Sequence, residues 1–351
     1  MTQRCVVSFE RAMTMSKELA VRAVDVGYGN TKFTVGALNQ GLNEICDMFP
    51  SLTPTALQNN FSHAIGQERD TVKISLDGET YEVGKEVRLA LGGGSHDRVL
   101  DENFCLSNRY LALVRASLAY MKVDDIACLV LGLPLTTYEA KRRQLEEFVC
   151  GQHTFGEKTV TIQKVTVVPQ PMGGFYDYVV QNGMSHAFDE RNLIIDPGFY
   201  TLDWVTSEGD RPIDSRSAAV NDAGASTILA SVREAIEADL KCDPGDIMRI
   251  DESLRTGRPL RVYGKQVDLE KYRPLIRQQA DGAVNKLISG AKGVVDIENV
   301  ILVGGATHLY LDAVKARFPN LEVHVGTDPV FANVRGFQML GEQWLKSNAS
   351  R

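Results

Sequence analysis

Residues 24–36, VDVGYGNTKFTVG, and residues 195–207, IDPGFYTLDWVTS, carry the same pattern twice. Each has an apolar residue, Asp, any residue, Gly and an aromatic residue, followed by an apolar run rich in β-branched side chains. Such a pattern predicts two short strands joined by a tight turn with Asp-x-Gly at its tip. Asp25 and Asp196 lie 171 residues apart in a chain of 351 residues. A repeat of this length is too long for a solenoid and indicates two similar domains.

Strand and helix patterns alternate along the rest of the chain, which is typical of an α/β protein. The continuous apolar run at 126–133, closed by Pro134, predicts a buried central strand. Residues 160–169 alternate in polarity and predict one further strand. Helical spacing of apolar residues occurs at 104–121, 137–150, 173–181, 223–240, 269–289 and 329–345.

The composition argues against several classes of function. With a formal charge of −7, the chain has no global basic field for direct binding to nucleic acid or to a membrane surface. No apolar run reaches the roughly 20 residues of a membrane span, and the N-terminal segment lacks the pattern of a signal peptide. The six cysteines and six histidines are dispersed, without the spacing of a disulfide framework or a zinc site. We therefore expect a cytoplasmic protein whose residues 1–18 form a flexible extension.

The two turns form a phosphate-binding site if they face each other across a cleft. Glycines let backbone N–H groups approach a polyphosphate, and Lys32 adds a positive charge, although it is equally compatible with an exposed strand end. Asp25 and Asp196 alone would repel phosphates, so they are expected to face Mg²⁺ through its water shell. The phosphate-binding residues expected on this basis are Gly27, Tyr28, Gly29, Asn30, Thr31, Lys32, Gly198 and Thr201.

Other glycine-containing segments match phosphate motifs less well. Residues 78–85, GETYEVGK, have five residues between the glycines where a Walker A loop has four, and no Ser or Thr follows the lysine. Gly27 and Gly29 are followed by a predicted strand and no third glycine, which excludes a Rossmann fingerprint.

Five ordered motifs resemble those of the actin-type ATPase superfamily (actin, heat-shock chaperone ATPases and sugar kinases). The resemblance covers about residues 19–345 and is greatest to the bacterial ParM/StbA plasmid-segregation actins. Within that group, LIIDPGFYTLDWV and FANVRGF look like the PRTRC system protein D set. The motifs are DVGYGNTK at 25–32, VVPQPMGGFYDYV at 167–179, DPGFYTLD at 196–203, LVGGATHLY at 302–310 and FANVRGF at 331–337.

The resemblance implies an actin-like fold, with two RNase-H-like α/β domains around a nucleotide cleft. The first domain would comprise residues 19–183 and 330–351, with a small subdomain at about 48–100. The second domain would comprise residues 184–329. Two helices would connect the domains and let the cleft open and close.

The resemblance also implies catalytic roles. Gln170 lies where actin has the glutamine that orients the hydrolytic water, and Asp196 would act near Mg²⁺ and the attacking water. Asp203, inside an apolar strand run, is expected instead to be a hydrogen-bonded structural group. Hydrolysis is expected to be slow because Pro197 removes one backbone donor from the second phosphate loop.

Four further positions are implied to contact the nucleotide. Gly304 and Gly305 fall in the adenosine motif, where their backbone would meet the nucleoside, and Ala306 follows them. Gly224, in NDAGAS at 221–226, matches a nucleotide-facing turn at a helix start. The implied ligands are ATP or GTP with Mg²⁺.

The function implied is that of an actin-like ATPase that polymerises head-to-tail into filaments. Such a contact is heterologous and does not need to close into a ring. The filament would segregate a plasmid or other DNA through a DNA-bound adaptor protein, without binding nucleic acid or membrane directly. Two alternatives stay open: a nonpolymerising nucleotide switch that binds a partner protein, and a small-molecule kinase of the same superfamily.

Overall fold

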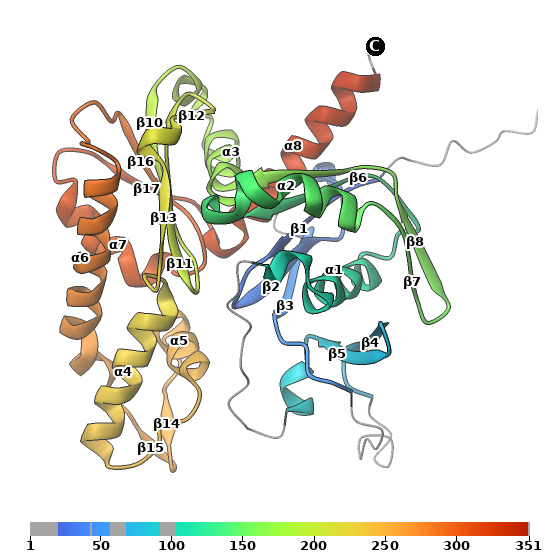
Figure 1. Ribbon diagram of the computed structural model, residues 1–351. Helices are drawn as coiled ribbons and strands as arrows, with labels where there is room; N and C mark the ends of the chain where they lie inside the picture. Colours follow the sequence, from blue (N-terminus) through green and yellow to red (C-terminus); the bar gives the residue numbers. More distant parts are fainter. Residues whose placement is uncertain (1–19, 43, 57–67, 92–102, 350–351) are drawn as a thin grey trace, which may run out of the picture.

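The computed structural model describes residues 20–42, 44–56, 68–91 and 103–349. In these ranges the chain forms two α/β lobes, the first in blue and green and the second in yellow and orange in Figure 1. The expected extension at 1–18 and parts of the expected subdomain at 48–100 lie outside the described residues.

The first lobe is built on one mixed sheet. Its strands are β1 (Ala20–Val26), β2 (Asn30–Thr34), β3 (Cys46–Pro50), β6 (Asp125–Leu133), β7 (Gly151–Phe155), β8 (Lys158–Ile162) and β9 (Val165–Pro169). Their spatial order is β3-β2-β1-β6-β8-β7, and β9 also pairs with β6. The helices packed around this sheet are α1 (Asn108–Met121), α2 (Leu135–Val149) and α8 (Ala332–Ala349).

The second lobe repeats this design. Its strands are β10 (Arg191–Pro197), β11 (Thr201–Glu208), β12 (Arg211–Pro212), β13 (Ala218–Asn221), β16 (Asn299–Leu302) and β17 (Val323–Val325). Their order is β12-β11-β10-β16-β17, with β13 also paired to β11. The helices of this lobe are α3 (Gln170–Asn182), α4 (Ala225–Leu240), α5 (Ile247–Thr256), α6 (Arg273–Gly290) and α7 (Thr307–Arg317).

The two sheets share a topology, which confirms the two similar domains that the repeat predicts. In the first, β1 pairs antiparallel with β2 and parallel with β6, and β6 pairs parallel with β9. In the second, β10 pairs antiparallel with β11 and parallel with β16, and β16 pairs parallel with β17. One turn joins β1 to β2 and the other joins β10 to β11. The two turns therefore occupy equivalent positions in the two sheets.

Helices on both faces of the first sheet explain why β6 reads as a continuous apolar run. Leu129 and Leu131 join the core that includes α1, whereas Val130 points to the opposite face and packs with Val334 and Phe337 of α8. Successive side chains of a strand point to opposite faces, so a strand covered on both sides is apolar at every position. The second sheet is covered by α4, α6 and α7 on one face and by α3 on the other.

The helices α3 and α8 cross at very short distance between the lobes. A Cβ atom added at Gly336 would lie 1.8 Å from the carbonyl oxygen of Gly173, so only glycine permits this approach. Arg335 of α8 donates two hydrogen bonds to Asp177 of α3, at 2.8 and 2.7 Å, and both side chains are buried. This crossing places the first turns of both helices beside the cavity described below.

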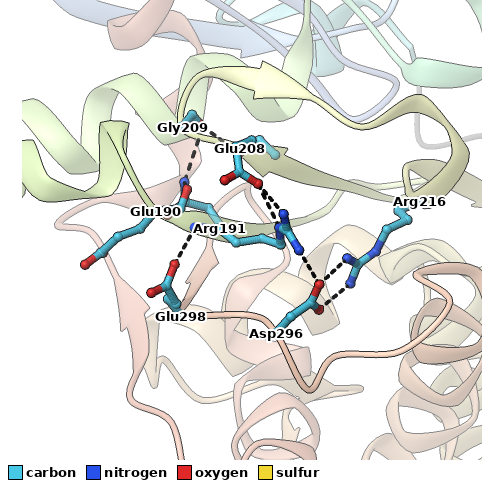
Figure 2. Close-up of polar contacts among 9 residues, drawn as sticks. Glu190, Arg191, Glu208, Gly209, Arg216, Asp296 and Glu298 are labelled. Carbon is cyan, nitrogen blue, oxygen red and sulfur yellow. Dashed lines mark hydrogen bonds and ion pairs between the residues drawn. The ribbon is translucent and has the colours of Figure 1, made fainter.

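An ion-pair network holds the end of the second sheet that lies away from the turns (Figure 2). Arg191, at the start of β10, contacts both Glu208 and Asp296. Arg216 donates to both oxygens of Asp296 at 2.8 and 2.9 Å, and together these hydrogen bonds lower the pKa of that carboxyl. The network ties the first residue of β10 to β11 and to the segment before β16.

Smaller elements complete the fold. Two short hairpins, β4–β5 in the first lobe and β14–β15 in the second, extend below the sheets in Figure 1. Their strands are β4 (Thr71–Leu76), β5 (Glu79–Gly84), β14 (Arg261–Val262) and β15 (Lys265–Gln266). Short 3₁₀ helices lie at Leu38–Gln40, Val87–Ala90, Phe104–Leu106, Ser185–Phe188, Asp214–Arg216, Leu269–Tyr272 and Pro329–Phe331.

The expectation of one strand at 160–169 is wrong. The segment forms β8 and β9, both parallel to β6, with a break between them where the chain leaves the hairpin with β7. In the described ranges, no helix is long and apolar enough to span a bilayer.

Candidate functional site

Both Asp-containing turns line one cavity between the lobes, with a volume of about 270 Å³. We call residues 25–32 the first tip and residues 196–203 the second tip. The expected site residues that line the cavity are Asp25, Gly27, Tyr28, Gly29, Asn30, Lys32, Gln170, Asp196, Gly198, Thr201, Gly304, Gly305 and Ala306. Segments far apart in the sequence therefore meet at one place.

Two expected residues, Thr31 and Gly224, do not line the cavity. Thr31 is buried, and its hydroxyl is hydrogen-bonded to Ser51, which in turn donates to the carbonyl oxygen of Gly27. Gly224 lies beneath the second tip, where an added Cβ would come within 2.5 Å of the backbone of Tyr200. Both residues support a tip from behind, and neither of them lines the cavity.

The first tip carries a carboxylate whose charge is compensated locally. Asp25 and Lys32 are opposite each other in the β1–β2 register, and Lys32 Nζ donates to Asp25 Oδ2 at 2.8 Å. Gln170, the first residue of α3, donates its side-chain amide to Asp25 Oδ1 at 2.7 Å. In the described part of the chain, no hydrogen bond involves Gln170 Oε1, so this acceptor remains for a ligand or a water.

The second tip carries two facing carboxylates instead. Asp203 takes the place that Lys32 has in the first tip, opposite Asp196 in the β10–β11 register. Asn333, at the start of α8, donates to Asp196 Oδ2 at 2.7 Å. Asp203 accepts from the hydroxyl of Thr201 at 2.5 Å and from the backbone N–H of Leu135 at 3.0 Å. Asp203 is thus a hydrogen-bonded group that also links the second tip to the start of α2.

Burial leaves this carboxylate pair difficult to ionise. Loss of solvation, aided by the charges of Asp203 and Asp25 and opposed by the hydrogen bond from Asn333, raises the pKa of Asp196 to about 7. Burial likewise raises the pKa of Asp203 to about 6, although its hydrogen bonds oppose the shift. The second tip therefore favours protonation, or a cation, near neutral pH.

Gly304 is required beside this pair. Its φ is +86°, and an added Cβ would lie 2.0 Å from Asp196 Oδ1. The following turn is tied to the second tip because the N–H of Ala306 donates to the carbonyl oxygen of Pro197 at 3.1 Å. The adenosine motif and the second tip thus form one rigid wall of the cavity.

The turns use some of the N–H groups that were expected to meet phosphate. The N–H of Gly27 donates to the carbonyl oxygen of Asn30 at 3.2 Å, and that of Gly198 donates to Thr201 at 2.9 Å. These equivalent bonds close both tips. Aromatic rings also connect the tips, since the centroids of Tyr28 and Tyr200 lie 5.5 Å apart.

Among the cavity residues that the sequence reasoning missed are Tyr110 and Asn333, and the long-range partner of Asn333, Asp196, gave no local signal. Another missed group is one face of α5, at the spacing i, i+3, i+4 and i+7, which presents three charged side chains and a methionine to the cavity. The residues of this face are Met248, Asp251, Glu252 and Arg255. A charged stripe at helical spacing on the segment after Asp246 was the available signal.

The donor set fits a hydrated magnesium ion. Asn333 Oδ1 is buried without a hydrogen-bond partner among the described residues, and it lies on the cavity wall beside Asp196. No group of three or more His, Cys, Asp and Glu side chains suited to a metal ion occurs in the described ranges. Mg²⁺ needs no such group, because it keeps several waters and uses one or two carboxylates together with substrate phosphates.

Two repeated α/β lobes with an acidic cavity between their hairpin tips define the actin-like class of proteins. Residues 23–173 match the family model described as the N-terminal domain of actin-like proteins. Residues 194–316 match the model of the C-terminal domain of the archaeal actin homologue MreB-like proteins. The chain belongs to the actin-like proteins.

Solved structures with this fold cover nearly the whole chain. The archaeal actin homologue Ta0583 has a TM-score of 0.76 at 20% identity, over 93% of this chain and 100% of that one. The ParM of a 15-stranded filament from Clostridium botulinum has a TM-score of 0.72 at 18% identity, over 92% and 99%. Ta0583 in complex with ADP has a TM-score of 0.72 at 20% identity, over 93% and 100%. No curated protein matches the chain in sequence.

Proposed function

We propose that this protein is a Mg²⁺-dependent ATPase, or GTPase, that polymerises into cytoplasmic filaments. The observation that supports the proposal most is the meeting of Asp25 and Asp196 at one cavity, each held by an amide from a connecting helix. A nucleoside triphosphate with its metal ion is the ligand class that two such acidic turns accommodate.

The residues of the first tip would bind and orient the substrate phosphates. Lys32 supplies a positive charge near Gly27, where an added Cβ would lie 3.2 Å from its Nζ. Gln170 is held by Asp25, and its Oε1 would accept a hydrogen bond from the attacking water and orient a lone pair toward phosphorus. Catalysis of this kind depends on positioning and charge neutralisation rather than on a covalent intermediate.

Asp25, Asp196 and Asn333 would hold Mg²⁺ through its waters. The ion supplies neutralisation of phosphate charge when it is bound. Asp196, in its ionised form, would lie beside the attacking water and assist its attack. Gly304–Ala306 and the cavity face of α5, which line the same cavity, would border the nucleoside.

Polymerisation is proposed from the similarity to filament-forming proteins. Structural neighbours include the ParM filament from Clostridium botulinum and the Alp12 filament, both below 25% identity. We propose head-to-tail self-association controlled by closure of the cleft around nucleotide, and DNA segregation through a DNA-bound adaptor protein. The domains would divide at 19–183 with 330–351, and 184–329. This division assigns both crossing helices, α3 and α8, to the first domain, although α3 packs on the sheet of the second lobe.

Nucleotide turnover tests the enzymatic part. The wild-type protein with ATP or GTP should release phosphate only when Mg²⁺ is present, and the Asp196→Ala variant should show no turnover although it remains folded. Retained hydrolysis in that variant would contradict the assignment.

Electron microscopy and light scattering, with and without Mg·ATP, test polymerisation. Filaments that appear only with nucleotide support the proposal. A light-scattering signal that stays flat over a wide range of protein concentrations, together with phosphate release, would favour a nonpolymerising switch. A coupled ADP assay with glucose, glycerol and acetate separates both from a small-molecule kinase, which would consume ATP only with an acceptor.

A further inference from the structure

Tyr110 has a buried hydroxyl that lacks a partner. The side chain lies in the first turn of α1, is 2% exposed, and lines the cavity between the tips. Within the described residues, no hydrogen bond involves its Oη. A hydroxyl buried without a partner destabilises the folded state, so a site that retains one points to a missing ligand group.

Another buried tyrosine shows what a structural hydroxyl looks like in this protein. Tyr310 of α7 is 0% exposed, and its hydroxyl donates to the carbonyl oxygen of Ala223 at 2.5 Å. Tyr272 similarly donates to Asp239 at 2.7 Å. Both hydroxyls contribute to the packing of the second lobe. The hydroxyl of Tyr110 has no such use, although the fold holds its ring firmly.

The ring of Tyr110 is positioned by its surroundings. Ser107 caps α1 and accepts a hydrogen bond from the backbone N–H of Tyr110 at 3.2 Å. Phe104 packs against the ring edge-to-face, with centroids 5.7 Å apart, and itself stacks on Tyr28 of the first tip. The hydroxyl therefore has a fixed position on the cavity wall next to the first tip.

The start of α1 adds a favourable field for an anion. Backbone dipoles give the N-terminal end of a helix a partial positive charge, and α1 has 14 residues. Asp25 does not bind the hydroxyl, since Tyr110 Oη has no hydrogen-bond partner among the described residues, and the Asp25 oxygens accept instead from Lys32 and Gln170. A phenolic O–H needs a strong acceptor, and phosphate oxygens are the strongest acceptors that the proposed ligand offers.

We propose that the hydroxyl of Tyr110 donates a hydrogen bond to a phosphate oxygen of the nucleotide bound in the cavity. This inference rests on the proposed function, since it assumes that the cavity binds a nucleotide. It assigns α1, an element outside the five sequence motifs, to phosphate recognition. It also explains why position 110 has a tyrosine with an unpartnered hydroxyl, where phenylalanine would fill the same space without that cost.

The test compares Tyr110→Phe with Tyr310→Phe, which remove the same atom from two buried rings. Without ligand, Tyr110→Phe should melt at the wild-type temperature or above, whereas Tyr310→Phe should melt lower because the Ala223 carbonyl loses its donor. Affinity is then measured by calorimetry for ADP, for a non-hydrolysable ATP analogue with Mg²⁺, and for orthophosphate with ADP present.

Tyr110→Phe should weaken binding of the triphosphate analogue about ten- to a hundred-fold, the range for one hydrogen bond to a charged acceptor. Tyr310→Phe should leave this affinity unchanged. An equal loss for ADP would place the contact at an inner phosphate, and a loss confined to the analogue and orthophosphate would place it at the terminal one. Unchanged affinity of Tyr110→Phe for every probe overturns the inference alone, and a wild-type protein that binds no nucleotide overturns the proposed function with it.

Discussion

The two tips have the same backbone and opposite electrostatics. In both, an aspartate near the end of a strand faces a residue of the returning strand, and a glycine N–H closes the turn. In both, the aspartate accepts from a side-chain amide at the start of a connecting helix. The facing residue differs, since it is Lys32 in the first tip and Asp203 in the second.

This single difference gives the tips of the two lobes opposite charge balances. In the first tip, the positive charge of Lys32 compensates the negative charge of Asp25, so the tip needs no bound cation. The second tip holds two buried carboxylates with raised pKa values, and protonation or a cation must supply the missing positive charge. A duplicated hairpin thus provides one tip whose charge is compensated within the chain and another that needs a proton or a cation.

The largest expected effect concerns the carboxylate of the second tip. Asp196→Asn keeps the shape and the contact with Asn333 but removes the charge near the proposed metal site. Turnover of nucleotide should fall by about 10²–10³-fold or more, the loss seen when one preorganised electrostatic group is removed from a site. Phosphate release under saturating Mg²⁺ and nucleotide measures it. Equal turnover in variant and wild type would mean that the second tip plays no part in catalysis.

The next effect separates two adjacent glycines. Gly304→Ala places a Cβ against Asp196 Oδ1 at a backbone with positive φ, so we expect a loss of about 1–3 kcal/mol from backbone strain together with displacement of the carboxylate. Gly305→Ala is the matched control, because its nearest neighbour, Val330 Cγ2, would lie 3.5 Å away. Urea unfolding and nucleotide affinity measure both variants. Equal stability and equal nucleotide affinity of the two variants would show that the backbone beside Asp196 shifts to accommodate the added Cβ at little cost.

The sequence pattern alone was sufficient to predict the two tips, whereas their convergence on one cleft was expected from the resemblance to the actin-type superfamily. A strand-turn-strand pattern fixes a hairpin locally, and its repetition at half the chain length placed Asp25 and Asp196 in equivalent positions. The register could also have been predicted, because a short turn leaves little choice in which residues face each other. The contrast between Lys32 and Asp203 was therefore present in the sequence, although only the structure drew attention to it.

Other parts of the site could not be predicted because they depend on tertiary packing. Asn333 meets Asp196 only because α3 and α8 cross at two glycines, and nothing local to Asn333 encodes that crossing. The α5 face carries no sequence motif, and it joins the cavity only through the packing of the elements around it. Tyr110 differs from a core aromatic residue only in the missing partner of its hydroxyl.

A third prediction tests the compensation in the first tip. Lys32→Met leaves the buried carboxylate of Asp25 with only the Gln170 amide, so the free energy of unfolding should drop by about 2 kcal/mol. Lys85→Met serves as the control, because its pair with Asp47 is about one-third exposed and exposed pairs contribute at most about 1 kcal/mol. Denaturant unfolding without ligand measures both. Equal losses would show that Lys32 is an exposed strand-end charge after all.

The smallest effect is a dependence of stability on pH that arises in the second tip. The pKa of Asp196 is about 7 in the folded protein and that of Asp203 about 6, against the usual 3.8. Between about pH 4 and pH 7 the folded state therefore holds protons that the unfolded chain has released. Their contribution to stability is complete below about pH 4 and is lost as pH rises through the folded pKa values.

Without nucleotide and Mg²⁺, the melting temperature should accordingly fall by a few degrees between pH 5 and pH 8. Asp196→Asn should flatten this slope because the amide does not titrate, whereas Asp47→Asn, in an exposed pair, should leave it unchanged. Mg²⁺ with nucleotide should stabilise the wild type more at pH 8 than at pH 6, since ligand and proton compete for the same carboxylates. A melting temperature that rises steadily from pH 5 to pH 8 would show that the facing carboxylates are already ionised and neutralised, which would remove the electrostatic difference between the tips.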